Sequence, residues 1–348
     1  MKIMKYQSPY SGLNSKDAVC LATNENPYPL PEILVDKIIK QVYKANRYPK
    51  LKNEKLVSLI ADHVGTISDN ILVAAGSDEL LVLLALSYIQ EGKNSIMFNP
   101  SFFRYKQVTE LAKGACKLVD CENFKCNLNT LIRYIDENTR VVFICNPNNP
   151  TGTFIDRKDI YSFLQNIPKD IIVVVDEAYY EFVNEKEGNQ SSIGLVDEFS
   201  NLVVLRTYSK LFGMAGLRIG YSIANPIITN ELEKVRSPYS VNAIAQEAAI
   251  AILENEMSFY KDYPNEVKYE REVFYNYFKE LSLEYVPSEA NFIFVKLGKN
   301  CNDIINKLRE ENIIIRPCDM FGFPQYARIT IGKNSENRRL LDALKRLI

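Results

Sequence analysis

The segment 206–221 (RTYSKLFGMAGLRIGY) places one lysine among hydroxyl side chains, glycines and an arginine. Thr207 and Ser209 precede Lys210, and Arg218 follows it by eight residues. A lysine amine becomes a nucleophile when desolvation and cationic neighbours lower its pKa. Hydroxyls and a guanidinium are also groups that hold a phosphate. The segment therefore predicts an amine that forms a Schiff base with an aldehyde carrying a phosphate.

An acid that could serve this lysine is Asp176, which directly follows the apolar run 171–175. A carboxylate at the end of such a run is costly unless a cation or a strong donor pairs with it. A protonated pyridine nitrogen is such a partner, and this pairing turns the ring of pyridoxal 5'-phosphate (PLP) into an electron sink. Lys210 and Asp176 together indicate PLP as the cofactor, with Tyr179 as a donor to its ring oxygen.

Two more predicted strands end in unusual residues. The run 71–75 is followed by Gly76-Ser77-Asp78-Glu79, which opens a predicted helix. Free N–H groups and the helix dipole at such a position bind phosphate, although a simple N-cap by Ser77 explains the pattern equally well. The run 140–145 is followed by NPNNPTG, in which Asn149 is well placed to hydrogen-bond a phenolate oxygen.

Two arginines each accompany an apolar, strand-like run near the C-terminus, Arg316 in IIIRP and Arg328 in ARITIG. A guanidinium matches a carboxylate or a phosphate with two parallel hydrogen bonds. Both arginines are therefore candidates for substrate binding, and structural ion pairs are the alternative.

These residues can form one site only in a fold that brings the ends of several strands together. Short β-rich runs alternate with amphipathic helical patterns such as 33–42 and 156–166, which predicts an α/β fold with a mostly parallel sheet covered on both faces. Ligands bind at the carboxyl ends of the strands in such sheets. The expected strands are 71–75, 95–99, 116–119, 140–145, 171–175, 202–206 and 218–223.

The pattern changes after about residue 255. A helical stretch at 267–281 leads into expected strands at 291–295 and 327–331 and helices at 303–310 and 336–347. We expect an N-terminal segment (1–35) that joins a small α+β domain (256–348), with a large cofactor-binding domain (36–255) between them.

Composition excludes several classes of protein. The 348 residues carry 42 basic and 43 acidic side chains, so no net field favours nucleic acid or an anionic membrane. No apolar run reaches the ~20 residues of a membrane span, and no signal peptide is visible, so the expectation is a cytoplasmic protein. The seven cysteines form no C-x-x-C pair and the one histidine, His63, is not near them, so no metal site is expected.

The motifs, in their order, resemble those of the fold-type I PLP-dependent aminotransferases, and within them the histidinol-phosphate aminotransferase branch. The likeness covers nearly the whole chain. Its motifs are Asn24-Glu-Asn-Pro27, Arg47-Tyr-Pro49, Gly76-Ser-Asp-Glu79, Asn146 to Gly152, Asp176 to Tyr179, Thr207 to Tyr221, Asn291-Phe292, Arg316 and Arg328.

The resemblance implies a large domain with a mostly parallel seven-stranded sheet and a role for each site residue. Lys210 would form the Schiff base and shuttle the proton, and Asp176 would pair with the pyridinium. Arg328 would bind the α-carboxylate of the amino donor, helped by Asn24, and with Arg316 it would also receive the substrate phosphate. The other implied cofactor contacts are Asn149 and Tyr179 at the ring hydroxyl, Phe102 over the ring, and Ser77, Asp78, Glu79, Thr207, Ser209 and Arg218 around the phosphate.

The resemblance also implies a homodimer with shared active sites, because Tyr48 would reach the phosphate of the partner subunit's cofactor. The implied reaction is a ping-pong transfer between glutamate/2-oxoglutarate, or another amino acid donor, and a small phosphorylated amine or carbonyl substrate. Phe102, Pro29 and Ser240 replace the tyrosine, glycine and asparagine usual in the family. A different phosphorylated ketone, such as dihydroxyacetone phosphate, therefore stays open as the acceptor.

Two further alternatives are weighed. A PLP-dependent decarboxylase of a phosphorylated amino acid would keep the cofactor, but that branch normally lacks the SKLFGMAG pattern at 209–216. A sensor domain of a transcription regulator would carry an added DNA-binding module, yet only about 23 residues precede the first cofactor-site motif. Aminotransfer is the prediction.

Overall fold

A computed structural model describes residues 18–184, 190–255 and 258–348. In this part of the chain the larger sheet has seven strands in the order β2-β8-β7-β6-β5-β3-β4. β8 runs antiparallel to both neighbours, and the other neighbouring pairs are parallel. The predicted α/β fold with a mostly parallel seven-stranded sheet is confirmed. The strands are β2 (Ile71–Ala74), β3 (Asn94–Asn99), β4 (Ala115–Asp120), β5 (Thr139–Cys145), β6 (Ile172–Asp176), β7 (Leu202–Thr207) and β8 (Gly220–Ala224).

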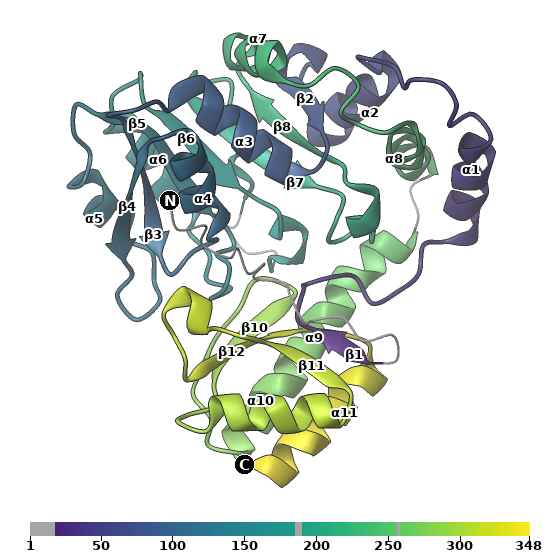
Figure 1. The fold of residues 1–348 in the computed structure, drawn as a ribbon, viewed down its shortest axis with the longest axis vertical. Coiled ribbons are helices and arrows are strands. Elements are labelled where there is room, and N and C mark those ends of the chain that lie inside the picture. Colours follow the sequence, from purple (N-terminus) through teal and green to yellow (C-terminus); the bar gives the residue numbers. More distant parts are fainter. Residues whose placement is uncertain (1–17, 185–189, 256–257) are drawn as a thin grey trace, which may run out of the picture.

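Both faces of this sheet are buried, which explains the unbroken apolar runs. In β6, Ile172 and Val174 belong to one apolar cluster, whereas Val173 and Val175 belong to the other. Each cluster continues into its own layer of helices, so the sheet is the middle of three layers (Figure 1). One layer contains α3 (Ser77–Tyr88), α4 (Arg104–Leu111) and α7 (Pro226–Val235), and the other α2 (Glu54–Val64), α5 (Leu128–Ile132), α6 (Arg157–Gln165) and α8 (Ala243–Asn255).

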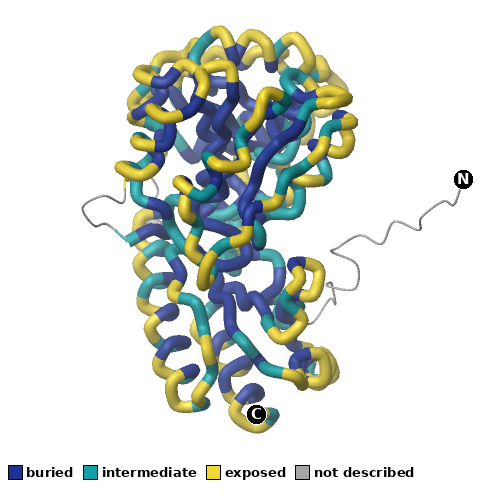
Figure 2. Tube along the Cα trace, turned by 90° about the vertical axis from the view of Figure 1, so that its left-hand side faces the viewer, coloured by how far each residue is buried: buried dark blue, intermediate teal, exposed yellow. Residues whose placement is uncertain are grey.

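A smaller mixed sheet forms the second lobe, in the order β1-β11-β12-β10-β9. β1, from the start of the described chain, runs parallel to β11, and the other pairs are antiparallel. Figure 2 shows buried segments inside both lobes and exposed segments around them. The elements of this lobe are β1 (Val19–Leu21), α9 (Ser258–Glu280), β9 (Tyr285–Val286), β10 (Phe292–Lys296), α10 (Cys301–Glu310), β11 (Ile313–Pro317), β12 (Tyr326–Thr330) and α11 (Asn334–Leu347).

We propose the expected division of the chain at 1–35, 36–255 and 256–348 as its domain organisation, with the first boundary moved to the start of α1 (Glu32–Val42). That helix packs against α8 of the large lobe, and splitting it would separate residues of one element. The remaining elements are short 3-10 helices: η1 (Ser68–Asn70), η2 (Tyr180–Phe182), η3 (Ser192–Leu195), η4 (Ala215–Leu217) and η5 (Asp319–Phe321).

One predicted strand begins two residues later than expected. The expected strand 218–223 starts only at Gly220, and Arg218 lies outside it with a left-handed φ of 57° after η4. The turn directs the arginine side chain away from the strand ladder and toward the carboxyl edge of the sheet. The short strands β1 and β9 were not predicted, because two or three residues carry too little pattern to be recognised.

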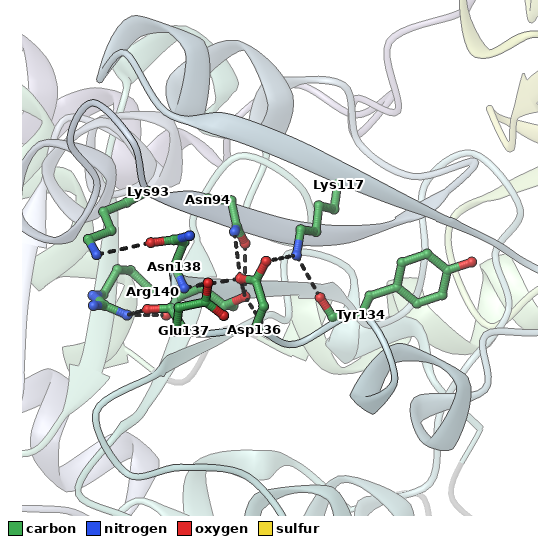
Figure 3. A network of polar contacts seen from close by, with 9 residues as sticks. Lys93, Asn94, Lys117, Tyr134, Asp136, Glu137, Asn138 and Arg140 are labelled. Carbon is green, nitrogen blue, oxygen red and sulfur yellow. Dashed lines mark hydrogen bonds and ion pairs between the residues drawn. The ribbon is translucent and has the colours of Figure 1, made fainter.

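The large sheet has one edge at which its parallel strands begin and another, the carboxyl edge, at which they end. The two differ in whether their polar groups are paired with one another. At the start of β3 and β5, Asp136 accepts hydrogen bonds from Lys117 Nζ (2.6 Å) and Asn94 Nδ2 (2.9 Å) (Figure 3). The hydrogen bond from Lys117 is the largest effect that lowers the pKa of Asp136 below its usual range. Because these groups are paired with one another, they are not available to a ligand, in contrast to those at the opposite, carboxyl edge.

No helix of the described chain combines the length and the apolar character needed to cross a membrane. Within the same residues, no group of three or more histidine, cysteine, aspartate or glutamate side chains is arranged to hold a metal ion.

Candidate active site

A cavity of about 520 Å³ opens at the carboxyl edge of the large sheet, next to β12 of the small lobe. The predicted site residues that line it are Asn24, Ser77, Asp78, Phe102, Asn149, Asp176, Tyr179, Thr207, Ser209, Lys210, Arg218 and Arg328. Residues of the wall that were not predicted are Thr23, Glu25, Phe103, Arg104, Gln107, Cys145, Ala178 and Ala215.

Lys210 lies three residues beyond the end of β7, in the wall of this cavity. Its Nζ donates a hydrogen bond to the carbonyl oxygen of Thr23 at 3.1 Å. Burial, followed by the positive charge of Arg328, lowers the pKa of Lys210 from 10.5 to about 8. A usable fraction of the amine is therefore unprotonated near neutral pH, which is what attack on an aldehyde requires.

Asp176 is the last residue of β6, and its side chain is almost fully buried. It accepts hydrogen bonds from Tyr105 OH at 2.9 Å and from the backbone N–H of Ala178 at 3.2 Å. Burial raises the pKa of Asp176 to about 6, and the hydrogen bond from Tyr105 acts in the opposite direction. An acid buried with donors but without a bonded cation is suited to receive one.

Tyr105 is the main contact of the site that sequence reasoning missed. It lies in α4 with its ring stacked on Phe143 of β5, 4.9 Å between centroids. Burial, followed by the charge of Asp176, raises its pKa well above the usual value, so the phenol remains a donor. The available signal was an aromatic residue three positions after Phe102, but that pattern is also typical of an ordinary core position.

Groups of the kind that can hold an anion lie close together where β2 and β7 end. Ser77 begins α3, whose first N–H groups have no partner within the helix. Thr207 Oγ1 and Ser209 Oγ are 3.0 Å apart, and Arg218 Nη1 donates to Ser209 Oγ at 3.4 Å. Gly76 has a φ of 87°, and a Cβ there would lie 2.5 Å from Arg218 Nη2, so glycine is what lets the guanidinium cross the helix start.

Hydrogen bonds among four residues of the cavity wall join the two lobes. Tyr179 OH accepts from Asn24 Nδ2 at 3.1 Å and from Asn149 Nδ2 at 3.4 Å. Arg328 Nη1 in turn donates to Asn149 Oδ1 at 2.6 Å, and its Nη2 donates to the carbonyl oxygen of Ala22 at 2.6 Å. The amides thus link the phenol to a guanidinium that is 5% exposed.

Arg328 retains unused hydrogen-bonding capacity. Among the residues that the structure describes, its buried Nε has no hydrogen-bond partner, although the two terminal nitrogens are engaged. A buried donor left unpaired costs about 1–3 kcal/mol. An anion entering the cavity beside Arg328 would remove that cost.

The wall of the cavity carries a third arginine, Arg104. Arg104 donates from Nε to Asp78 Oδ1 at 2.6 Å and from Nη2 to Asp78 Oδ2 at 3.0 Å. Phe102, which also lines the cavity, packs edge-on against Phe103 and Tyr105. The side chain of Asp78 is thus engaged by Arg104, so only its backbone is left for an anion.

Three predicted site residues lie outside the cavity wall. Glu79 accepts a hydrogen bond from the backbone N–H of Ala75 at 2.5 Å and thus braces the turn before α3. Tyr48 is 84% exposed and stacks on Tyr239. Arg316 is buried opposite Arg328 in the β11–β12 register, where its Nη2 contacts Met320 Sδ at 2.9 Å.

Comparison with known proteins identifies the family of this chain. The pattern of the family described as "Aminotransferase class I and II" matches residues 16–344. A histidinol-phosphate aminotransferase from Caldicellulosiruptor saccharolyticus is 39% identical over 336 residues, which are 97% of this chain and 93% of that protein. Another from Geobacillus sp. (strain WCH70) is 34% identical over 332 residues, covering 95% of this chain and 90% of that protein.

The fold agrees as well. The crystal structure of histidinol-phosphate aminotransferase from Sinorhizobium meliloti in complex with pyridoxal-5'-phosphate has a TM-score of 0.86 at 23% identity, covering 94% of this chain and 91% of that chain. The resemblance found in the sequence is thereby confirmed. The chain belongs to the class I and II aminotransferase family, with histidinol-phosphate aminotransferases among its relatives.

Proposed function

We propose that this protein is a PLP-dependent aminotransferase that moves an amino group between glutamate/2-oxoglutarate, or another amino acid donor, and a small phosphorylated carbonyl compound of the histidinol-phosphate type. One observation carries the proposal. A single cavity of about 520 Å³ brings together the amine of Lys210, the buried acid Asp176, the anion pocket at Arg218 and the guanidinium of Arg328.

The chemistry of these donors fits PLP. The start of α3 with Ser209 and Arg218 is suited to its phosphate, Asp176 to its pyridine nitrogen, and Tyr179 to its ring oxygen. PLP supplies an aldehyde and an electron-withdrawing ring. A pyridinium would also offset the free-energy cost of burying the ionised carboxylate of Asp176. That side chain is buried with a pKa of about 6, and none of the described residues gives it a bonded cation.

The side chains then have separable tasks. Lys210 Nζ would accept the proton from the α-carbon of the amino donor and return it two bonds away, to the carbon that carried the aldehyde, which its lowered pKa permits. Arg328 holds the donor's carboxylate. Asn149 fixes Arg328 and Tyr179 in place, and Asn24 also fixes Tyr179. Closure of the two lobes around the substrate would exclude water from the transfer.

Arg316 is proposed as a second contact for the substrate phosphate. It is paired with Arg328 across two antiparallel strands, so both side chains project from the same face of the small sheet. Met320 of η5 is one of the contacts of its guanidinium, and a movement of this segment is proposed to accompany a turn of Arg316 toward the cavity. Two buried guanidinium groups favour a phosphate monoester over a neutral side chain.

The cofactor spectrum tests the reaction. An amino acid donor such as glutamate should convert the holoenzyme to its amine form, and a phosphorylated ketone should restore the starting spectrum. If no amino acid donor converts the cofactor, aminotransfer is excluded. Release of carbon dioxide from threonine phosphate without a keto acid would support the decarboxylase alternative instead. The kcat/KM values for imidazole-acetol phosphate, dihydroxyacetone phosphate and phenylpyruvate would identify the acceptor.

The variant Arg316→Ala tests the phosphate contact. We expect its kcat/KM to fall by at least 10-fold for phosphorylated acceptors and by much less for glutamate, because a charged hydrogen bond is worth about 1.5–3 kcal/mol. Arg338→Ala, an exposed arginine in α11, serves as the matched control. An equal loss for both substrates would contradict the role of Arg316.

A homodimer with shared active sites is part of the proposal. α1 exposes Ile33, Ile39 and Val42 at about half of their surface each, close in sequence to the exposed Tyr48. A second copy of this chain covering that face would bury these side chains and carry its own Tyr48 to the neighbouring cavity. The cytoplasmic location stays a prediction from the sequence.

Mixing two inactive variants tests the sharing. Lys210→Ala and Tyr48→Ala subunits are unfolded and refolded together in equal amounts. About half of the dimers should then be mixed, and each mixed dimer has one of its two sites intact, so about a quarter of the wild-type sites should be regained. If the mixture stays as inactive as the separate variants, or if the protein sediments as a monomer, Tyr48 does not serve a neighbouring subunit.

A further inference from the structure

Two thiols touch each other outside the proposed active site. Cys121 Sγ and Cys126 Sγ are 3.1 Å apart, and both side chains are half-buried, each at one end of the loop 121–126 after β4. Neither is in a disulfide, and neither lines the active-site cavity. The aminotransferase chemistry proposed above gives this pair no task.

The backbone of the loop explains why the sulfur atoms meet. Glu122 and Lys125 form an antiparallel bridge, with Lys125 N–H donating to Glu122 O at 2.9 Å. Asn123 and Phe124 between them both have positive φ, 49° and 61°, as in a two-residue type I′ hairpin turn. The next pair outward is Cys121 and Cys126, side by side on the same face.

This position suits a covalent link. In an antiparallel register the pair beyond a hydrogen-bonded one is non-hydrogen-bonded, with Cα atoms about 4.5 Å apart. Disulfides span Cα–Cα distances of about 4.4–6.8 Å. The turn can therefore accept a bond between its two sulfur atoms with little movement of the backbone.

The turn also touches both lobes. Phe124, at its tip, packs edge-on against Phe294, Phe323 and Tyr326 of the small lobe, with centroids 5.2, 5.3 and 5.5 Å away. The backbone oxygen of Phe124 accepts a hydrogen bond from Thr153 Oγ1 at 3.2 Å. A bond across the base of the turn would hold this contact between lobes.

We propose that Cys121 and Cys126 are an oxidation site, at which two thiols convert to an intrachain disulfide that fixes the turn against the small lobe. The oxidant is a low-molecular-weight disulfide. The thiolate of Cys121 attacks one of its sulfur atoms and releases one thiol, and the sulfur of Cys126 then attacks Cys121 and releases the second. Two S–H bonds are lost, one S–S bond forms, and the oxidant takes up two electrons and two protons.

The order of attack follows from the surroundings of Cys126. Its hydrogen bond with Cys121 and its burial raise the pKa of Cys126 well above the usual value. Cys126 is therefore the second, resolving thiol, and oxidation should become faster as the pH rises.

Tryptic mapping of the full-length protein provides the test, because cleavage after Lys125 separates the two cysteines. After incubation with glutathione disulfide and alkylation of the remaining thiols, the peptides 118–125 and 126–133 should be recovered as one species, about 2 Da lighter than their sum. Dithiothreitol should separate them. Amide hydrogen exchange in the turn should slow on oxidation and recover on reduction.

Near-isosteric variants act as controls. Cys121→Ser and Cys126→Ser should each abolish the joined species, whereas Cys116→Ser, in the preceding strand β4, should retain it. Recovery of both peptides as separately alkylated or glutathionylated species from the oxidised protein would overturn the proposal. A bond from either residue to Cys116 or Cys145 instead would also overturn it, because the turn geometry joins only Cys121 and Cys126.

Discussion

The hydrogen bond from Tyr105 to Asp176 offers a direct test of how the candidate site is tuned. The variant Tyr105→Phe keeps the ring stacked on Phe143 but removes the phenol that donates to the carboxylate at 2.9 Å. This hydrogen bond lowers the pKa of Asp176, and burial, the larger effect, raises it to about 6. Removing the donor should therefore raise that pKa further.

The size of the shift follows from the charge of the acceptor. A hydrogen bond to a charged group contributes about 1.5–3 kcal/mol, and 1.36 kcal/mol corresponds to one pKa unit. The pKa of Asp176 should thus rise by about one to two units, to about 7–8. At pH 7 the carboxylate fraction would fall from about nine-tenths to between about a half and a tenth.

Binding of PLP to the apoprotein between pH 5.5 and 9 measures this shift, because only the carboxylate can pair with a pyridinium. In the wild type, binding should weaken as the pH falls through about 6, and in Tyr105→Phe through about 7–8. The curves should converge at high pH. Tyr161→Phe, which removes a phenol from the exposed Glu198, is the matched control. A uniform weakening at every pH, with an unmoved midpoint, would refute the tuning role.

Two further changes concern buried charges. The pKa of Lys210 is about 8 in the folded state and 10.5 without perturbation, so the unfolded chain binds more protons between these pH values and stability rises with pH there. The free energy of unfolding of the Lys210→Met apoprotein, measured by urea denaturation, should exceed that of the wild type by up to about 3 kcal/mol at pH 7. The difference should shrink by pH 10. Glu177→Gln removes the main partner of buried Arg206 and should cost about 3 kcal/mol, against under about 1 kcal/mol for Glu231→Gln, whose partner Lys234 is exposed. Equal effects of the two glutamates would contradict this.

The sequence predicts a site residue when chain order alone fixes its position, and not when its position depends on packing. Lys210 and Asp176 follow apolar runs, and parallel strands end at one edge, so their convergence could be foreseen from chain order. Tyr105 could not, because its hydrogen bond spans 71 positions and depends on how α4 is rotated about its axis. The position of Arg316 behind the cavity wall likewise depends on packing around Met320, which no local pattern encodes.

The two aspartates at opposite edges of the large sheet show what distinguishes a site from a structural network. Asp136 is bonded to Lys117 and to Asn94, and the pKa of its carboxyl is lowered, so its charge stabilises the fold above the usual carboxyl pKa. Asp176 is buried and hydrogen-bonded only by neutral groups, and its pKa is raised, so its charge destabilises the apoprotein above about pH 6. The chain retains that unfavourable carboxylate in the wall of a cavity that can admit a cation. Binding of a protonated ring there is therefore favoured by relief of a cost already present in the empty fold, and the same carboxylate would then hold the ring in its electron-withdrawing form.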